Sequence, residues 1–487
     1  MKHVSPLDRK SGVPLYEQTA NRIENMVREG VLLPGDRIPS IRRIRNMFNV
    51  SVSTAVEACH TLEDKGIITA RPQSGHYVND LPVIELGEPS PSKTYKRPYR
   101  LDQTLPMQLV FAIEDPSIVQ LGASIPNYDL MPFQTLARLT GKIMREQPVR
   151  TLGYSASRGL IECRRVISKR MMHAGISVGP EQITMTSGAI ESVYLALKAV
   201  TKPGDTVAIE CPTFYDFIET LKSLHLKTLS IGTHPRDGIS FKGLGEALQN
   251  KRVQAVLIIS NFSNPLGVCM SSSRKEALVK MLKRYNVPLI EDDIYGDLSF
   301  DNTRPKAAKA FDKHDQVIYC SSYSKTIAPG LRVGWTVGGI WQQQIEQIKL
   351  AVNHASSSVG QMTIAHYLNG EGYDRHLRKL RKVYQRQMHL ISRYISEYFP
   401  SQTRISRPTG GHILWVELPK MVDSIALYEQ AMANKIAIAP GPIFCPGMKL
   451  YRNCLRLNTG LTWDDRVEPA IQRLGELIND QMINCQT

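Results

Sequence analysis

The first 80 residues of the chain have a short helical rhythm that ends in a hairpin pattern. Apolar positions at helical spacing predict three helices, over residues 14–30, 41–48 and 54–65. Ser40 precedes the second helix as a candidate cap, residues 50–53 form a turn, and Gly66 ends the third helix. Two short apolar runs, at 67–70 and 76–78, flank a loop of turn-forming residues and predict two strands. This order of elements predicts a winged helix-turn-helix domain of α+β class.

The pattern changes from about residue 106, where apolar strands alternate with longer helices. Three hydrophobic runs are almost uninterrupted, at 253–260, 287–291 and 317–321. Such runs are typical of parallel strands that helices bury on both faces. We therefore expect an α/β body over residues 106–487, with a smaller α+β subdomain after about residue 370. Residues 81–105 contain four prolines and little periodicity, and we assign them to a linker between the domains at 1–80 and 106–487.

Composition indicates a globular protein without a membrane segment. Hydrophobic residues make up 42% and charged residues 22% of the chain. The N-terminal sequence lacks an apolar signal region, and no stretch of about 18 apolar residues follows. The eight cysteines are scattered, with no spacing typical of a zinc site. We expect a cytoplasmic protein with reduced thiols and no bound metal.

Charge alone does not locate a nucleic-acid interface. The formal net charge is +15, but residues 1–80 carry 11 Lys and Arg against 9 Asp and Glu, which leaves only +2. Most of the excess lies in the body, where the basic run at 375–386 is best interpreted as a solvated helix surface. The DNA-binding part must be identified by its motif.

Polar residues on the second helix and at the start of the third are candidates for DNA contacts: Arg42, Arg43, Ser51, Ser53 and Thr54. Guanidinium groups can reach phosphates or base edges, and hydroxyls and amides at a helix start suit phosphate oxygens. The run LPGDRIPSIRRI…VSVSTAV…SGHYV resembles the GntR family of winged-helix regulators, except that Val52 stands where the family usually has a basic residue. The alternative is a winged helix used only for protein contacts.

The strongest chemical motif runs from Ser322 to Arg332. Lys325 follows a buried strand, and its amine could form a Schiff base with an aldehyde cofactor. Arg332 could bind a phosphate through two nitrogens, and Ser322 and Ser324 could donate hydroxyls to it. This SxSKxxxPGxR run resembles fold-type I pyridoxal-phosphate enzymes. The alternative is a surface lysine near an unrelated arginine.

Other motifs follow in the order that the resemblance implies. Asp292, with Asp293 as the alternative, would pair with the pyridinium nitrogen of pyridoxal phosphate. Tyr295 and Asn264 would reach the phenolic oxygen of the cofactor. The phosphate of the cofactor would be bound at Gly188 and by the amides of Ala189 and Ile190. Phe214, or else Tyr215, would stack on the cofactor ring.

Two residues imply an assembly and an effector. Tyr154 matches the tyrosine that crosses a dimer interface to the cofactor phosphate of the neighbouring subunit, which implies a homodimer. Arg456 matches the arginine that binds the α-carboxylate of an amino acid, although a structural ion pair is the alternative.

The combination of both domains resembles the MocR group of transcription regulators. The resemblance implies a head-to-tail, domain-swapped dimer that binds double-stranded DNA and senses an amino compound, or pyridoxal phosphate itself, through aldimine exchange at Lys325. It implies at most weak transaminase activity. The alternative is an active aminotransferase with a secondary DNA-binding role, since Lys325, Asp292 and Arg456 are all present. Nothing in the sequence favours a third possibility, a cofactor-storage or scaffold protein.

Overall fold

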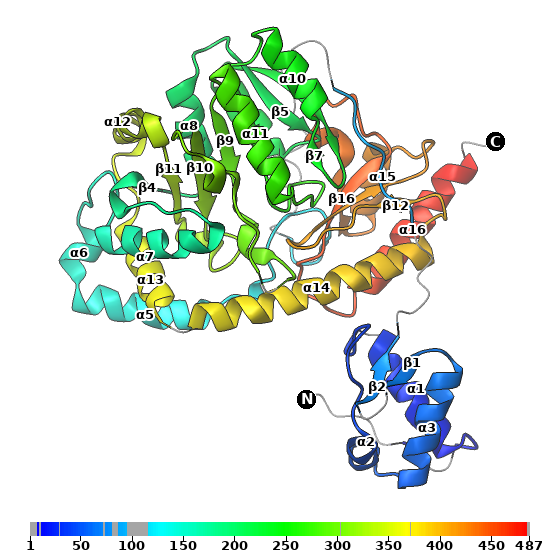
Figure 1. The fold of residues 1–487 in the computed structure, drawn as a ribbon. Helices are drawn as coiled ribbons and strands as arrows, with labels where there is room; N and C mark the ends of the chain where they lie inside the picture. The colour runs from blue at the N-terminus through cyan, green and yellow to red at the C-terminus, as the bar shows by residue number, and fades with distance from the viewer. Residues whose placement is uncertain are drawn as a thin grey trace. The chain divides into compact units, whose positions relative to one another are not determined.

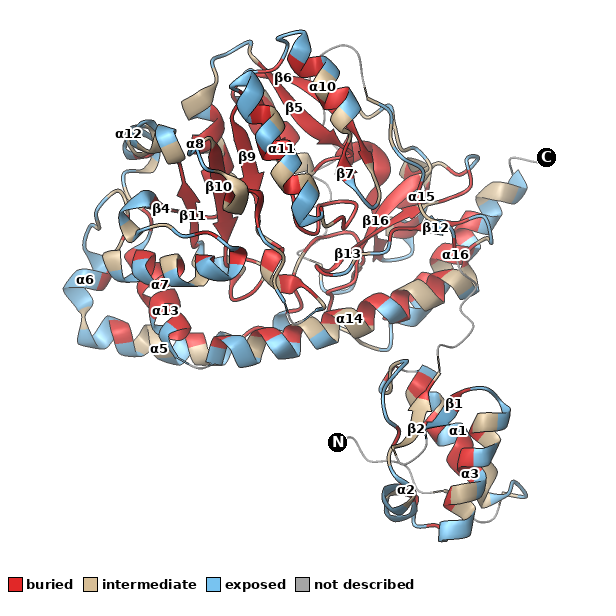
Figure 2. Ribbon diagram, viewed as in Figure 1, coloured by how far each residue is buried: buried red, intermediate tan, exposed pale blue. Residues whose placement is uncertain are grey.

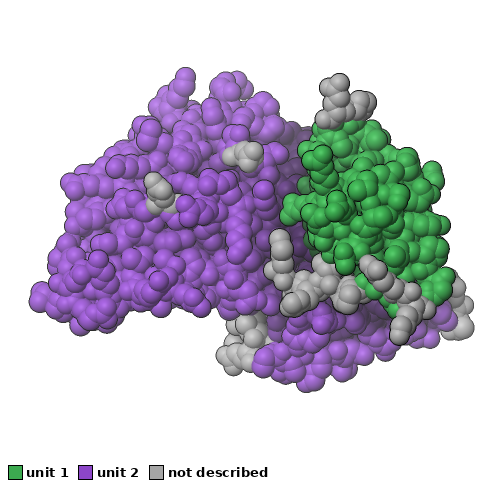
Figure 3. Space-filling model, turned by 90° about the horizontal axis from the view of Figure 1, so that it is seen from below, with its two compact units in different colours: residues 1–85, 389–397 green, residues 86–388, 398–487 purple. Residues whose placement is uncertain are grey.

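The computed structural model describes residues 7–8, 11–28, 30–71, 74–79, 86–94, 115–301, 303–370 and 372–484. The chain divides into two compact units, which Figure 3 distinguishes by colour. The first contains residues 1–85 and 389–397, and the second contains residues 86–388 and 398–487.

The small N-terminal unit is a winged helix. Its elements are α1 (Leu15–Arg28), α2 (Ile41–Phe48), α3 (Val52–Asp64), β1 (Ile68–Arg71) and β2 (Gly75–Val78). The two strands pair antiparallel, with Ile68 opposite Val78. Their buried side chains join those of the three helices in one apolar core, which includes Ile23, Ile44 and Leu62 (Figure 2). The predicted helix-turn-helix and wing are therefore confirmed.

Two details at the helix starts differ from the sequence expectation. The third helix begins at Val52, two residues before the predicted start, because Ser51 takes the N-cap position. The Ser51 hydroxyl accepts a hydrogen bond from the Thr54 amide at 3.0 Å, so residues 52 and 53 belong to the helix and not to a turn. Ser40 does occupy the N-cap of α2, but its side chain forms no capping hydrogen bond.

The large unit is built on an eight-stranded mixed sheet (Figure 1). The strand order is β4-β11-β10-β9-β8-β5-β6-β7. The strands are β4 (Ile183–Thr186), β5 (Thr206–Cys211), β6 (Lys227–His234), β7 (Gly238–Ile239), β8 (Ala255–Ile258), β9 (Leu289–Asp292), β10 (Val317–Ser322) and β11 (Gly334–Val337). The central strands from β10 to β6 are parallel, which confirms the interpretation of the three apolar runs as buried parallel strands. β11 is antiparallel to both of its neighbours.

Helices cover both faces of this sheet, and Figure 2 shows that its strands are buried apart from the ends of β6. Alternate residues of β5 point to opposite faces. Val207 and Ile209 pack with α8 (Ala189–Val200) and α9 (Tyr215–Ser223), whereas Ala208 packs with α10 (Phe241–Gln249) and α11 (Ser272–Tyr285). The remaining helices of the α/β part are α5 (Phe133–Glu146), α6 (Pro148–Leu152), α7 (Ile161–Met171), α12 (Gln342–Asn353) and α13 (Ser358–Asn369).

The predicted α+β subdomain contains a four-stranded antiparallel sheet, in the order β12-β13-β16-β15. Its strands are β12 (Arg404–Ile405), β13 (Ile413–Glu417), β15 (Ala439–Pro440) and β16 (Cys454–Asn458). Its helices are α14 (Gly372–Tyr398), α15 (Ser424–Ala433) and α16 (Val467–Asn484). β3 (Val119–Gln120) reaches across from the start of the body to pair with β14 (Ile436–Ala437).

Part of the segment predicted to be a linker lies against the large unit. The Ser90 amide donates to the Glu417 carboxylate at 2.7 Å, and the Thr94 hydroxyl accepts from the Gly232 amide at 3.0 Å. Residues 86–94 therefore follow the edges of both sheets, whereas 81–85 and 95–105 lie outside the described residues. Across the described ranges, no helix is both long enough and apolar enough to cross a bilayer.

Candidate cofactor and effector site

Lys325 lies three residues after the end of β10, within a cluster of charged groups. Its Nζ donates a hydrogen bond to the Ser124 carbonyl oxygen at 2.5 Å. Burial lowers the pKa of Lys325 to about 8, and the positive charge of Arg456 also lowers it. The negative charges of Asp216 and Asp292 act in the opposite direction and raise it. About a tenth of the amines are therefore uncharged, and nucleophilic, at pH 7, far more than for an ordinary lysine.

Asp292 is the last residue of β9 and is buried. Its Oδ1 accepts a hydrogen bond from the Ile294 amide at 3.1 Å. Burial raises the pKa of this carboxyl group to about 7, while Lys325 acts to lower it. A carboxylate in this environment is poised to pair with a cationic nitrogen, because such a partner would favour its charged form.

Asp293, the alternative to Asp292, is already committed to structural contacts. Its carboxylate pairs with Arg304 at 2.7 Å and accepts hydrogen bonds from Asn261 at 2.8 Å and from the Tyr319 hydroxyl at 3.0 Å. These partners use its lone pairs, so Asp292 remains the better candidate for the cofactor nitrogen.

Arg456 and Asn264 meet beside Lys325. Arg456 lies on β16 with no exposed surface, and its Nη1 donates to Asn264 Oδ1 at 3.0 Å, while Nη2 donates to the Gly122 carbonyl oxygen. Its guanidinium carbon lies 5.0 Å from the centre of the Phe444 ring. Arg456 Nε and Asn264 Nδ2 are both buried and reach no acceptor in the described structure. Buried donors without acceptors are rare, and here they indicate where a ligand would supply oxygen atoms.

Tyr295 completes this side of the cluster. Its hydroxyl shares a hydrogen bond with the Ser124 hydroxyl at 3.0 Å, and Asn264 lies near enough to act on it. Burial raises the pKa of Tyr295 to about 12, so the phenol is neutral at physiological pH and can donate its proton.

The candidate phosphate-binding residues gather at the start of α8. Gly188 precedes this helix with φ +125°, and a Cβ atom there would lie 2.5 Å from Arg332 Nη2. The glycine therefore permits the close approach of the guanidinium group. Ala189 and Ile190 open the helix, where the first amides lack acceptors within it. Ser322 is the last residue of β10 and Ser324 lies two residues beyond it; both are buried, and the Ser324 amide donates to the Ser322 hydroxyl at 3.3 Å.

The structure places the three aromatic candidates differently. Phe214 precedes α9, partly buried, with its ring centre 4.8 Å from that of Tyr215. The Tyr215 ring centre is in turn 5.9 Å from that of Phe444, beside Arg456. Tyr154 stands apart, with 95% of its surface exposed and its ring centre 5.6 Å from that of His354.

Sequence reasoning missed three residues of this cluster: Ser124, Asp216 and His412. Ser124 contacts both Lys325 and Tyr295 from a loop far away in sequence. His412 is buried, its Nδ1 lies 2.9 Å from Asn458 Oδ1, and burial together with the charge of Lys325 lowers its pKa to about 3. Asp216 stands two residues after Phe214, and His412 directly follows the paired glycines Gly410 and Gly411, which also fit the family pattern, whereas Ser124 lies near no recognised motif.

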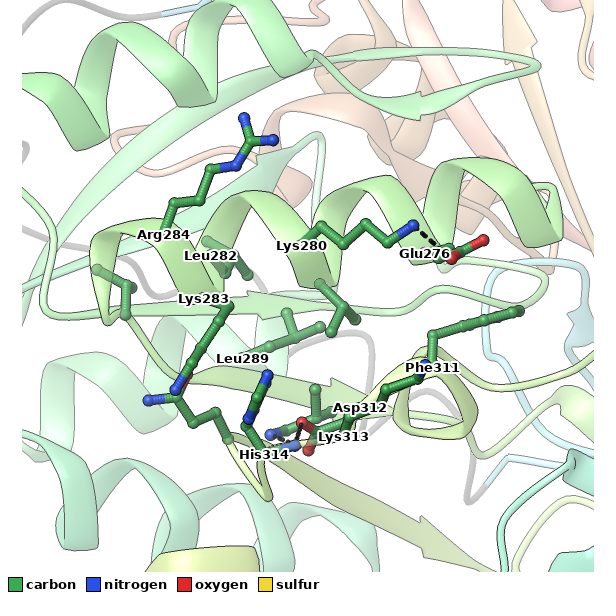
Figure 4. Close-up of a pocket in the computed structure, with 14 residues that line it drawn as sticks. Glu276, Lys280, Leu282, Lys283, Arg284, Leu289, Phe311, Asp312, Lys313 and His314 are labelled. Atoms are coloured by element: carbon green, nitrogen blue, oxygen red, sulfur yellow. Dashed lines mark hydrogen bonds and ion pairs between the residues drawn. The ribbon is translucent and has the colours of Figure 1, made fainter.

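A surface groove of about 310 Å³ between α11 and residues 311–317 is a different feature (Figure 4). Its floor is apolar, and basic side chains line its rim, where Lys280 pairs with Glu276. None of the residues predicted to contact cofactor, effector or DNA lines this groove.

In the winged helix, the candidate DNA-contacting residues lie at the surface. Arg42 and Arg43 are exposed on α2. The Ser51 hydroxyl lies 2.8 Å from that of Ser53 and 2.7 Å from that of Thr54, so these hydroxyls form one polar group at the start of α3. Val52, which departs from the family pattern, is half exposed beside them.

Comparisons with known proteins agree with this architecture. Residues 15–78 match the family described as bacterial regulatory proteins, gntR family, and residues 116–474 match aminotransferase class I and II. The HTH-type transcriptional regulator YdcR of Escherichia coli (strain K12) is 36% identical over 468 residues, which cover 96% of this chain and 99% of YdcR. The HTH-type transcriptional regulator NorG of Staphylococcus aureus (strain USA300) is 28% identical, over 90% of this chain and 98% of NorG.

Among solved structures, Pyrococcus horikoshii kynurenine aminotransferase, in complex with PMP, superposes with a TM-score of 0.73 at 27% identity. The match covers 78% of this chain and 95% of that structure. Both predicted domain types are thereby confirmed. The chain belongs to the aminotransferase class I and II family and carries a GntR-family winged helix in front of that domain, as a relative of the HTH-type transcriptional regulators.

Proposed function

We propose that this protein is a MocR-type transcription regulator that binds pyridoxal phosphate and senses an amino compound at Lys325. The observation that carries the proposal is the pair of buried donors without acceptors, Asn264 Nδ2 and Arg456 Nε, beside the Lys325 amine. They lie in a chain whose other unit is a GntR-family winged helix.

The residues present fit the cofactor. Ser322, Ser324, Arg332 and the first amides of α8 would hold its phosphate, where Gly188 leaves room that a larger residue would fill. Asp292 would hold the ring nitrogen, and Tyr295 and Asn264 the phenolic oxygen. When bound, pyridoxal phosphate supplies an aldehyde carbon that bonds a primary amine, either that of Lys325 or that of the effector.

The protein's own groups would then distinguish the two amines. Arg456 offers its guanidinium group to the carboxylate of an effector and so orients the effector amine toward the position that Lys325 occupies. Lys325, with its lowered pKa, accepts or releases a proton near neutral pH as it is displaced. An effector that binds one arrangement of the two units better than another would change the affinity for DNA.

The lowered pKa of Lys325 gives a testable pH dependence. Because deprotonation creates the nucleophile, the yield of pyridoxal phosphate fixed on Lys325 by brief borohydride treatment should rise with pH, with a midpoint near 8. An ordinary lysine would give a midpoint of about 10.4. Peptide mapping by mass spectrometry measures the yield at this residue alone, and a midpoint near the ordinary value would contradict the lowered pKa.

DNA binding should depend on the exposed arginines of α2. We expect Arg42→Ala to weaken binding of the full-length protein to its own upstream DNA and to reduce the slope of log affinity against log salt by about 1, since one phosphate contact is lost. Arg378→Ala, which removes an exposed arginine of α14, is the matched control and should change neither. Equal effects of the two changes, measured by fluorescence anisotropy at several salt concentrations, would reject the assignment.

The second candidate function is an active aminotransferase, which the retention of Lys325, Asp292 and Arg456 in one cluster favours. Steady-state transamination with amino donors and keto acceptors should be measured in parallel with DNA binding. We expect specific DNA binding with at most slow turnover. Rapid turnover without a specific DNA site would instead establish the enzyme.

We also propose a homodimer in which Tyr154 reaches the cofactor phosphate of a second subunit. The support for this proposal is the exposure of Tyr154: 95% of its surface is left uncovered by its own chain. Exposed tyrosines of this extent are commonly found at interfaces, where their apolar ring becomes buried.

A further inference from the structure

Two cysteines, Cys211 and Cys445, lie in contact inside the large unit, although 234 residues separate them along the chain. We propose that this pair is an oxidation site, at which a hydroperoxide converts the two thiols into a reversible disulfide. The disulfide would link the end of β5 in the large sheet to the segment that follows β15 in the α+β subdomain. The inference goes beyond the proposed function, because neither cysteine is among the residues assigned to cofactor, effector or DNA.

The two sulfur atoms lie close to bonding distance. They are 3.9 Å apart, and the two residues are buried, with 0% and 3% of their surfaces exposed. A disulfide bond is about 2.05 Å long, so the sulfurs need to approach by roughly 2 Å, which side-chain rotation can supply. The backbones are already held together, because the Thr213 amide donates to the Phe444 carbonyl oxygen at 2.9 Å. The fold therefore places the pair for a cross-link without a large movement of either segment.

Tyr451 favours Cys211 as the thiol that reacts first. Its hydroxyl donates to Cys211 Sγ at 3.5 Å, and Tyr451 is itself partly exposed, so this contact leads from the sulfur toward solvent. Hydrogen bonding with Cys445 lowers the pKa of Cys211, burial acts against this, and the bond from Tyr451 lowers the pKa further. The same contact raises the pKa of Cys445. Because the thiolate is the nucleophile, Cys211 is the thiol that would attack the peroxide.

The reaction consumes one peroxide and proceeds in two steps. The Cys211 thiolate attacks one oxygen of hydrogen peroxide, the O–O bond breaks, and the sulfur becomes a sulfenic acid while the second oxygen leaves as water. The Cys445 sulfur then attacks the Cys211 sulfur, the S–O bond breaks, and the hydroxyl group leaves with the Cys445 proton as a second water. The two sulfurs lose two electrons, which the peroxide gains. A dithiol such as dithiothreitol reverses the bond by thiol–disulfide exchange.

A purely structural explanation of the pair makes a different prediction. Buried cysteines pack as small apolar side chains, and their thiols react slowly for lack of access. In that case oxidation should follow exposure, and the partly exposed Cys269 should react before the buried pair. Proximity predicts the opposite order, so the identity of the oxidised residues separates the two explanations.

The test treats the native full-length protein with hydrogen peroxide, removes the peroxide with catalase, and blocks the remaining thiols with N-ethylmaleimide in denaturant. Unreduced peptides are then mapped by mass spectrometry. We expect the peptides of Cys211 and Cys445 to be joined in most molecules, with the loss of two hydrogen atoms, and to separate after dithiothreitol. Cys445→Ser should abolish the link and leave a sulfenic acid on Cys211 that dimedone labels. Cys269→Ser is the matched control and should form the link as the wild type does.

Three results would overturn the proposal. The first is a linked fraction no greater than in untreated protein, and the second is oxidation of Cys269 while Cys211 and Cys445 are recovered as blocked thiols. The third is a mixture of disulfides among other cysteines in comparable amount, because this indicates random oxidation of unfolded chains. Should Cys445→Ser not fold, as judged by its melting temperature, the peptide map of the wild type still decides the question.

Discussion

Lys325→Ala should abolish covalent attachment of pyridoxal phosphate to this protein. The phosphate-binding and ring-binding residues remain in the variant, so the cofactor should still bind, but reversibly and without the absorbance band of an imine. After borohydride reduction and gel filtration, the wild type should retain cofactor on the peptide that contains Lys325, and the variant should retain almost none. Lys198→Ala, which removes an exposed lysine of α8, is the matched control and should behave like the wild type.

The physical reason is the local environment of this amine. The pKa of Lys325 lies near 8 because burial and Arg456 disfavour its charge, whereas exposed lysines are almost fully protonated at neutral pH. If Lys325→Ala still retained reducible cofactor in one-to-one amount, another amine would have to be the attachment point, and the cofactor site described above would be wrong.

Arg456→Lys should reduce the affinity for amino acids far more than the affinity for amines that lack a carboxylate. Lysine keeps the positive charge but loses the planar pair of donors, and such a replacement is not conservative at a bidentate site. Loss of this pairing should cost about 2 kcal/mol or more, which corresponds to roughly a 30-fold or larger rise in Kd. The same titration with the decarboxylated amine should change by less than about threefold.

The two ligands act as internal controls for folding. The variant leaves the Asn264 amide oxygen and the Gly122 carbonyl oxygen with fewer donors, so some thermal destabilisation is expected. A general loss of structure would weaken both ligands equally, whereas loss of carboxylate recognition weakens one. Equal weakening in a variant with an unchanged melting temperature would assign Arg456 to a structural role.

Hydrophobic pattern was sufficient to predict the centre of the fold but not its edges. β8, β9 and β10 are buried on both faces, so their sequences are almost continuous apolar runs. β11 is antiparallel and lies beside the parallel centre, next to the edge strand β4, and the pairing of β3 with β14 joins segments more than 300 residues apart. Such pairings depend on tertiary contacts, which local periodicity does not encode.

Helix ends show the same limit at a smaller scale. Both Ser40 and Ser51 precede helices, yet only the Ser51 hydroxyl accepts a backbone hydrogen bond. The choice depends on the side-chain orientation of each serine, which the residue type does not determine. The prolines of residues 81–105 predicted a linker, but they did not indicate that residues 86–94 would form hydrogen bonds with the body.

The candidate site was predictable where its residues lie in continuous motifs. The run from Ser322 to Arg332 contains Lys325 and the candidate phosphate-binding residues, and a second run contains Asp292 and Tyr295. Each of these residues could therefore be assigned a role from the sequence, and each role remains a prediction. Ser124 reaches the cluster from a loop, Asp216 from the first turn of α9, and His412 from the residue before β13. Their contribution becomes visible only when the fold brings β10, α9 and β13 together.

Binding of one ligand should change both the state of the bound cofactor and the affinity of the protein for DNA. The most direct test titrates an amino compound into the full-length, cofactor-loaded protein and records cofactor absorbance and anisotropy of labelled upstream DNA in the same samples. Both signals should change with the same midpoint, and DNA affinity should change by about fivefold or more. A complete change in absorbance with constant DNA affinity would show that the cofactor site does not control DNA binding.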